Sequence, residues 1–279
     1  MNSNQSSIPD TGRPSLGVLN FREGTKRFFE LTRYPPSEDI GYFVKHFWMV
    51  RWDLNGQPPY LQQVVPNPCV NMVVEKNRTL IYGAAKHKFS RLLEGKDMVF
   101  GVKFKPGGFY PFAKRPISRL TGRFIRLESI FNVETESFEE QILSQDSPEK
   151  MVELAEALIR RNLPGRDEKV VRINQIIDRI QADRGITKVD QVCDGFQINI
   201  RKLQRMFGQY VGVSPKWVIK LYRLQNAAET LDQGRAPDWL DLSLKLGYYD
   251  QSHFIRDFRS IIGKTPEEFL TESKETMEH

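Results

Sequence analysis

Residues 254–269 read FIRDFRSIIGKTPEEF, and residues 203–218 read LQRMFGQYVGVSPKWV. The two stretches align at an offset of 51 positions (254 minus 203). An internal repeat of this kind indicates two copies of one structural unit. The matched pairs are Leu203 with Phe254, Arg205 with Arg256, Phe207 with Phe258, Gly212 with Gly263, Ser214 with Thr265, Pro215 with Pro266 and Val218 with Phe269.

Each copy predicts a helix that ends sharply and is followed by another helix. The apolar residues four positions apart bury one helix face, and the arginine between them points elsewhere. The glycine can end the helix in a left-handed conformation. The Ser-Pro or Thr-Pro pair that follows is a typical helix start.

A short helical segment and a tight turn precede each copy. The short helices are expected at 189–193 and 240–246, and the turns at 195–197 and 247–249. Asn199 and Asp250 then stand at the N-caps of the second helices. Helix, short turn and capped helix is the helix-turn-helix pattern, so the sequence predicts two such units.

A helix from Ser214 to about Asp232 is expected between the two units. It would be about 28 Å long at about 1.5 Å per residue. Successive major-groove faces on one side of DNA lie about 34 Å apart. A rigid helix of this length could therefore place two recognition helices in adjacent turns of the major groove.

Positive charge is concentrated at the first unit. Six basic residues and no acidic residue occur between positions 199 and 223, whereas Arg256, Arg259 and Lys264 of the second unit are opposed by Asp250 and Asp257. The net charge of +6 also favours an acidic partner. We therefore expect the first unit to supply more of the attraction to phosphate.

Residues 168–271 resemble the AraC/XylS family of bacterial transcription regulators. The resemblance rests on LQRMF with GVSP and on LGYYDQSHFIRDFRSIIGKTPEEF. It implies a sequence-specific, DNA-binding transcription regulator with two helix-turn-helix units joined by a long helix. RNA polymerase, a second copy of the chain and a small-molecule effector would be its further partners. Gln197 departs from the family pattern, which often has glycine in the first turn.

The resemblance also assigns the residues that would read DNA bases. The side-chain types suit contacts with base edges, while Lys216 suits a phosphate. Arg205 and Arg256 could instead bind phosphate or a carboxylate within the domain, and His253 could pack against its neighbours or bind phosphate. The first helix would present Arg201, Gln204 and Arg205, and the second Gln251, Ser252, His253, Ile255 and Arg256.

The N-terminal half predicts a mainly-β domain over residues 17–143, so the whole chain is an α+β protein of two domains. Short aromatic and β-branched runs separated by turn signals favour a sandwich or a barrel, and a cupin-like barrel occurs in the family. Residues 1–16 are expected to be disordered, residues 144–167 to form a linker with a helix that starts at Pro148, and residues 272–279 to form a tail.

Three features of this half leave alternatives open. The run GVKFKPGGFYPF (101–112) resembles a segment of some sensor domains in the family, while its Pro106-Gly107-Gly108 favours a tight turn between strands. The aromatic residues of 42–52 could form the core or line a pocket. The basic residues of 76–126 could form a solvated face, bind an anionic effector or add DNA contacts.

Catalysis, metals and cofactors are not expected. No Gly-x-Ser-x-Gly, HExxH or phosphate-binding glycine loop occurs, and His46 and His87 are too few for a cupin metal site. Cys69 borders an apolar strand and is expected in the core. No signal peptide or membrane span is predicted, so we expect a cytoplasmic protein. The alternatives to a regulator are an enzyme or repair protein with a DNA anchor, and an effector-independent DNA binder.

Overall fold

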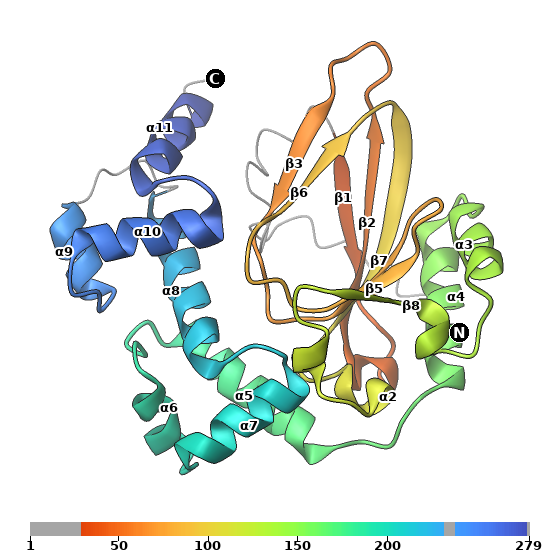
Figure 1. Ribbon diagram of the computed structural model, residues 1–279. Helices are drawn as coiled ribbons and strands as arrows, with labels where there is room; N and C mark the ends of the chain where they lie inside the picture. The colour runs from red at the N-terminus through yellow and green to blue at the C-terminus, as the bar shows by residue number, and fades with distance from the viewer. Residues whose placement is uncertain (1–28, 232–237, 278–279) are drawn as a thin grey trace, which may run out of the picture.

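The computed structural model describes residues 29–231 and 238–277, which form a β-domain (29–161) and a helical domain (168–277) (Figure 1). The expected disorder of 1–16, and residues 278–279 of the expected tail, lie outside the described residues. Within the described part of the chain, no helix combines the length and apolar character that crossing a membrane requires.

The β-domain is built on a six-stranded sheet in which every neighbouring pair of strands is antiparallel. The side chains of β2 alternate between its two faces, as the period of a strand requires. Phe47 and Met49 point to one face, and Trp48 and Trp52 to the other. In spatial order the strands are β1 (Glu30–Tyr34), β2 (Val44–Asp53), β7 (Lys96–Phe104), β4 (Asn71–Val74), β5 (Leu80–Tyr82) and β8 (Phe124–Arg126).

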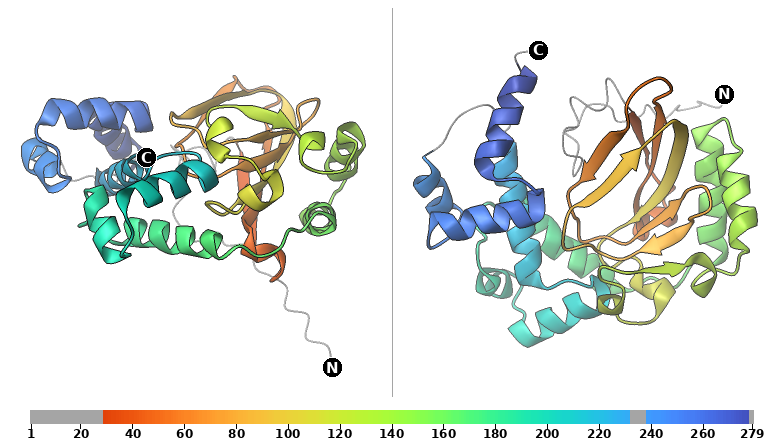
Figure 2. Two further views of the ribbon diagram at one scale, coloured as in Figure 1. Left: turned by 60° about the horizontal axis from the view of Figure 1, so that its bottom comes forward. Right: turned by 45° about the horizontal axis from the view of Figure 1, so that its top comes forward.

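Each face of this sheet is covered by a different layer. A two-stranded sheet, β3 (Tyr60–Val64) and β6 (Phe89–Leu93), packs over Trp48 and Trp52. Helices α3 (Thr135–Leu143) and α4 (Pro148–Arg161) cover the opposite face (Figure 2). Among the described residues β1 and β8 remain separate edges, so the sandwich alternative holds and a closed barrel does not form.

Helix α4 belongs to the core of the β-domain. Met151, Leu158 and Ile159 are buried against the sheet. Glu156 accepts a hydrogen bond from the backbone N–H of Ser37 at 2.7 Å. The helix expected in a linker over 144–167 is thus part of the domain, and the connection to the helical domain is the shorter stretch 162–167.

The segment that precedes β2 is helical. Residues Ile40–Tyr42 form a short 3-10 helix, η1. The stretch before it is held to α4, because Asp39 forms an ion pair with Arg160 at 2.7 Å. This ion pair keeps the pKa of Asp39 well below its usual range. The sequence of the segment alone does not predict the ion pair, because Arg160 lies far away in the chain.

The helical domain has one continuous core. The first helix of this domain buries one apolar face, formed by Val170, Ile173, Ile176, Ile177 and Ile180. Val65 and Ala84 of the β-domain belong to the same buried cluster. The helices are α5 (Glu168–Ala182), α6 (Val189–Gly195), α7 (Ile200–Tyr210), α8 (Pro215–Leu231), α9 (Trp239–Lys245), α10 (Gln251–Ile262) and α11 (Pro266–Met277), so residues 272–277 of the expected tail are helical.

The Pro106-Gly107-Gly108 segment joins the two domains. It follows β7 and leads into the short helix α2 (Tyr110–Ala113), so the expected turn between strands is wrong. The carbonyl of Pro106 accepts a hydrogen bond from Asn174 of α5 at 3.0 Å. Gly107 has φ +78, and a Cβ there would lie 3.3 Å from Ile173. The backbone conformation and the close approach of α5 both require glycine here.

The β-domain also forms hydrogen bonds with the C-terminal end of α7. The hydroxyl of Thr121 donates a 2.6 Å hydrogen bond to the carbonyl of Gly212, just beyond that helix. Gln209 of α7 donates to the hydroxyl of Tyr110 in α2. Two side chains of the β-domain thus form hydrogen bonds at the C-terminal end of α7, which is one of the predicted recognition helices.

Asp167, at the start of the helical domain, completes the connection. Its backbone carbonyl accepts a hydrogen bond from the Tyr42 hydroxyl at 2.7 Å, and its carboxylate accepts one from Tyr210 at 2.6 Å. Burial and this bond to Asp167 raise the pKa of Tyr210, so the hydroxyl remains a donor at neutral pH.

A substitution in the sheet tests this packing. The ring of Trp48 crosses over Gly101, and a Cβ there would lie 2.2 Å from the indole carbons. Gly101→Ala should lower the free energy of unfolding by about 1–3 kcal/mol through overpacking, measured by urea denaturation. Gly165→Ala is the control, because nothing lies within 4 Å of its Cβ position. Equal effects of the two changes would contradict the packing described.

Candidate nucleic-acid interface

The first unit is assembled from α6, a three-residue turn and α7. Asn199 caps α7 as predicted, and its side chain accepts a hydrogen bond from the Arg201 N–H at 2.8 Å. Gln197 takes a left-handed φ of +48 in the turn, the conformation that glycine adopts most easily. Leu203 and Phe207 are fully buried, which fixes the opposite face of α7 toward solvent.

The second unit repeats this construction. Gly247 takes a φ of +70 in its turn, and the carboxylate of Asp250 accepts a hydrogen bond from the His253 N–H at 2.7 Å. Phe254 and Phe258 of α10 are fully buried. The two predicted helix-turn-helix units are therefore confirmed, together with both predicted caps.

Left-handed glycines end both second helices. Gly212 has φ +92 and Gly263 has φ +94. The hydroxyl of Ser214 then accepts a hydrogen bond from the backbone at the start of α8. Thr265 does the same for α11, and the carboxylate of Glu268 accepts in return from the Thr265 N–H at 2.7 Å.

Helix α8 separates the two units. It has 17 residues and is about 26 Å long at about 1.5 Å per residue. Helices α7 and α10 lie one above the other in Figure 1 and run in the same direction, and the second viewpoint agrees (Figure 2). Their C-terminal ends face the β-domain, where Thr121 contacts Gly212 and Lys88 contacts Gly263. The N-terminal ends, which carry the predicted base-reading residues, point away from it.

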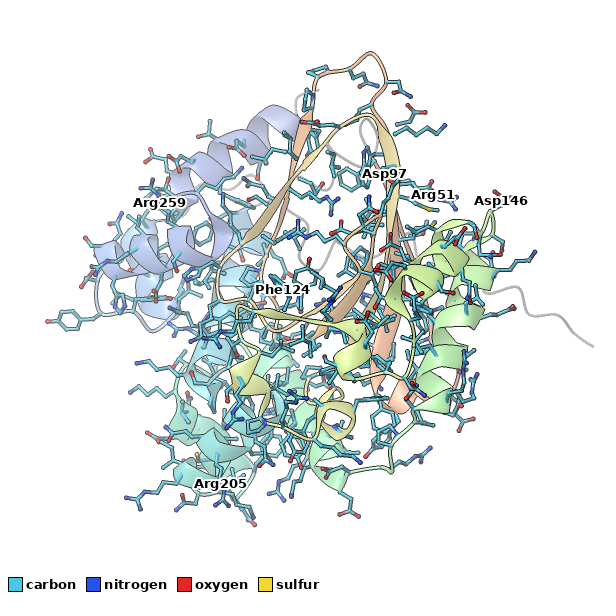
Figure 3. All side chains as sticks on the ribbon, turned by 45° about the vertical axis from the view of Figure 1, so that its right-hand side comes forward. Arg51, Asp97, Phe124, Asp146, Arg205 and Arg259 are labelled. Atoms are coloured by element: carbon cyan, nitrogen blue, oxygen red, sulfur yellow. The ribbon has the colours of Figure 1, made fainter. Side chains whose placement is uncertain are left out.

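The predicted residues of the first unit lie together on one exposed surface. Arg201, Gln204 and Arg205 are all exposed on α7, and Lys216 is exposed in the first turn of α8. Arg205 projects on the side of the helical domain away from the sheets (Figure 3). None of the residues that the structure describes covers this part of α7.

The predicted residues of the second unit differ in exposure. Ser252, His253 and Arg256 are exposed on α10, and Gln251 is half-buried. Ile255 is half-buried because it packs against the core of the helical domain. Its apolar tip is therefore shared between the core and the outer surface.

The alternatives for the arginines and His253 can be compared with the geometry. Among the described residues, neither Arg205 nor Arg256 forms an ion pair, so the structure gives no support to the alternative of a carboxylate within the domain. His253 lies edge-on to the Tyr248 ring, with centroids 5.2 Å apart, and its Nε2 is 3.7 Å from Asp257. It therefore has a packing contact while remaining exposed.

A polar network ties α10 to α8. Asp257 accepts a hydrogen bond from Lys220 at 3.0 Å and from the Tyr248 hydroxyl at 3.2 Å. The guanidinium of Arg223 lies over the Tyr248 ring, 4.6 Å from its centroid. Burial, and then the charge of Asp257, raise the pKa of Tyr248. These contacts set the orientation of α10 on the connecting helix.

Sequence reasoning missed three exposed side chains of the same surface. Arg259 stands three positions after Arg256 and projects outward (Figure 3). Lys202 is exposed on α7, and Tyr249, in the turn before α10, is 93% exposed. Helical spacing from Arg256 could have indicated Arg259, whereas the exposure of Tyr249 depends on the turn geometry.

A basic groove of about 560 Å³ lies between α5 and α7. Its lining includes Lys169 and Arg172 from α5, and Lys202 and Arg205 from α7. Arg172 also donates to the carbonyl of Phe196 in the turn of the first unit, at 2.9 Å. The groove extends the positive surface of α7 toward α5, which suits a polyanion running past the helix.

Two exposed, capped second helices held parallel by a connecting helix define a DNA-binding protein of the double helix-turn-helix class. Residues 192–272 match the family described as a helix-turn-helix domain, and residues 32–126 match one described as a domain of unknown function, DUF6597. No curated protein sequence matches the chain significantly. The repeat and this match identify the C-terminal region as an AraC-type helix-turn-helix domain, and the protein is a DNA-binding transcription regulator.

Solved structures of such regulators are also similar to the chain. A probable AraC family transcriptional regulator from Rhodopseudomonas palustris shares 28% identity, covering 36% of this chain and 94% of that chain, with a TM-score of 0.32. ToxT from Vibrio cholerae shares 12% identity, covering 88% of this chain and 98% of that chain, with a TM-score of 0.37. A structure of ToxT bound to an unsaturated fatty acid shares 13% identity, covering 93% and 96%, with a TM-score of 0.37.

The network around Asp257 gives a testable prediction. Asp257→Ala should lower the free energy of unfolding by about 1.5–3 kcal/mol, because the buried Tyr248 hydroxyl and the half-buried Lys220 lose a charged acceptor. Asp241→Ala is the control, since Asp241 forms an exposed pair with Lys245 at 2.7 Å, and its loss should cost less than about 1 kcal/mol. Chemical denaturation measures both, and a smaller effect at Asp257 than at Asp241 would refute the role of the network.

Proposed function

We propose that α7 and α10 enter successive turns of the major groove on one face of a DNA duplex. The observation that carries this proposal is the parallel course of the two helices, with their N-terminal ends exposed on the side away from the β-domain. The recognition helix of a helix-turn-helix unit places its N-terminal residues against base edges. With α8 between the helices, both can engage one duplex without unfolding either unit.

The exposed side chains suit direct reading of bases. Arg201, Arg205 and Arg256 can each donate two hydrogen bonds to guanine, and Gln204 or Gln251 can pair with adenine. The half-buried Ile255 can contact a thymine methyl group with its exposed part. Ser252 and His253 complete the proposed contacts of α10.

Phosphate contacts would come from the residues around this surface. Lys216 is exposed in the first turn of α8, and Lys202 and Arg172 line the groove beside α7. Such contacts position a protein on DNA without reading its sequence. They account for the higher positive charge of the first unit.

Regulation of transcription is favoured over the two alternatives. An architectural binder needs only backbone contacts and deformable DNA, whereas both exposed helices here present base-reading side chains. An enzyme with a DNA anchor would need a catalytic site in the β-domain, and the sequence has no Gly-x-Ser-x-Gly or HExxH motif to supply one. We also propose RNA polymerase and a second copy of the chain as partners, and the bacterial cytoplasm as the location. These parts of the proposal rest on the family resemblance.

An effector is proposed because the β-domain is joined to a proposed recognition helix, at the end of α7 opposite its base-reading residues. Thr121 and Tyr110 of the β-domain hold the end of α7. A small molecule could bind more tightly when the β-domain is docked on α7 or when it is released. That difference in its affinity for the docked and released states would set how far it changes the affinity for DNA.

Two substitutions separate base reading from phosphate binding. Gln204→Ala should relax preference at one base position, at a cost of about 1–3 kcal/mol for the preferred duplex. Lys216→Ala should weaken all duplexes alike and reduce the slope of log affinity against log salt by about 0.9. Gel-shift titrations at several salt concentrations, on a duplex selected from a random library, measure both effects.

Lys150→Ala is the control, because Lys150 is exposed on α4, in the β-domain. The unsubstituted protein should prefer the selected duplex over a scrambled one by at least about a thousandfold. Failure to select any preferred duplex would refute a sequence-specific regulator. Identical losses on preferred and scrambled DNA for Gln204→Ala would refute the base-reading role of that residue.

A further inference from the structure

A cavity of about 160 Å³ lies between the two domains. The β-domain contributes the start of β2, the end of β7 and the Asn67–Cys69 stretch, and the helical domain contributes α5 and α8. Neither domain encloses the cavity alone. Whatever fills it therefore touches both domains at once.

The lining of this cavity is strongly basic. Lys45, Lys103 and Lys105 all line it, and no ion pair or side-chain hydrogen bond joins any of them to another described residue. Asp178, at the α5 side, is the one carboxylate among the lining residues. The charged lining groups thus sum to a net +2, from three lysines and one aspartate.

The pKa shifts of Lys103 and His46 reflect both their burial and this positive potential. Burial lowers the pKa of Lys103, and the charges of Lys45 and Arg33 lower it further, while buried Cys69 acts in the opposite direction. Burial and the same cations depress the pKa of His46 to about 3, so His46 is neutral at pH 7. Lys103 is half-buried without a counter-charge, which is costly, and an anion beside it would offset that cost.

An unsatisfied polar group points to the same cavity. The side-chain oxygen of Asn67 is buried and has no hydrogen-bond partner among the described residues. Asn67 lines the cavity together with the lysines. Its amide can accept a hydrogen bond, or donate one after rotation. A ligand with polar atoms would satisfy it, as buried polar groups in proteins nearly always are.

We propose that this cavity is the effector site of the protein and takes a small organic anion that carries a carboxylate or phosphate group. Lys103 of β7, Lys105 just after that strand and Lys45 of β2 bind the anionic group, and Asn67 bonds a further polar atom of the ligand. Tyr222 and Leu221 of α8 provide an apolar wall. The cavity volume is below the usual range of about 300–1,000 Å³ for drug-sized ligands, so the ligand is compact.

The cavity lies next to the contacts that the β-domain makes with the C-terminal end of α7. Lys105 directly precedes Pro106, whose carbonyl binds Asn174, and Asn174 also lines the cavity. Gly107 follows and packs against Ile173 and the Cβ of Tyr210, the last residue of α7. An anion that binds residues of both domains stabilises their docked arrangement. The effector role rests on the proposed function, whereas binding of the anion does not.

Thermal unfolding of the full-length protein tests the site. The probes are inorganic phosphate, acetate and succinate, each titrated at constant ionic strength with chloride as the balancing anion. We expect a saturable rise in Tm with phosphate or with a carboxylate, because a ligand that binds only the folded state stabilises it. The anion that acts distinguishes phosphate recognition from carboxylate recognition.

Lys103→Met should abolish this rise, and Lys45→Ala, at the exposed rim, should weaken it at least tenfold in half-saturating concentration. Lys76→Met is the control and should respond as the unsubstituted protein does, because Lys76 is exposed and lies outside the cavity. If Lys103→Met does not fold, Lys45→Ala decides. An equal rise in all variants, or no saturable rise with any probe, would overturn the proposal.

The gel-shift titration with the selected duplex keeps the two proposals separate. DNA affinity without added anion should be unchanged in Lys45→Ala. Loss of the Tm response with intact sequence-specific binding would reject the anion site alone. Loss of specific DNA binding with an intact Tm response would reject the proposed function alone.

Discussion

Burial of α8 is the constraint on which the rest of the helical domain depends. Nine of its 17 residues are buried, and they cover more than one face of the helix. A helix that is packed on several sides cannot turn about its axis without emptying the core. The two helix-turn-helix units therefore do not behave as independent modules on a flexible tether, and the angle between α7 and α10 is a property of the core.

The β-domain adds a second constraint at one end of this assembly. Gly107 and Gly212 both take left-handed conformations, and a Cβ on either would crowd the opposite domain. Interfaces between domains are commonly polar and loosely packed. Here Val65 and Ala84 instead extend the core of the helical domain. The position of the β-domain against α7 is thus fixed by specific contacts.

Much of the helical domain could be predicted from sequence because its signals are local. Asn199, Asp250 and Gly263 each act on a backbone within a few positions of themselves, and a repeat displays such signals twice. Two packing arrangements could not be predicted from the sequence. Helix α4 packs on the sheet through contacts such as Glu156 to Ser37, 119 residues apart in the chain. The PGG segment binds α5 through Asn174, 68 residues away from Pro106.

The same distinction holds at the candidate interface. Which residues of α7 are exposed follows from helical spacing, because Leu203 and Phe207 mark the buried face. The cavity between the domains combines Lys45, Asn67 and Lys103 with Tyr222, which are brought together only by folding. The sequence shows that basic residues are dense in the β-domain. It does not show which of them are exposed to solvent and which line the cavity.

The charge of the second unit illustrates why a count of residues misjudges a surface. Asp250 and Asp257 formally oppose the arginines of α10. In the structure Asp250 caps the helix and Asp257 accepts hydrogen bonds from Lys220 and Tyr248, so both carboxylates are committed within the domain. Arg256 and Arg259 remain exposed on the outer surface. Because an approaching polyanion meets these arginines first, the second unit can take part in phosphate binding although its formal charge is nearly balanced.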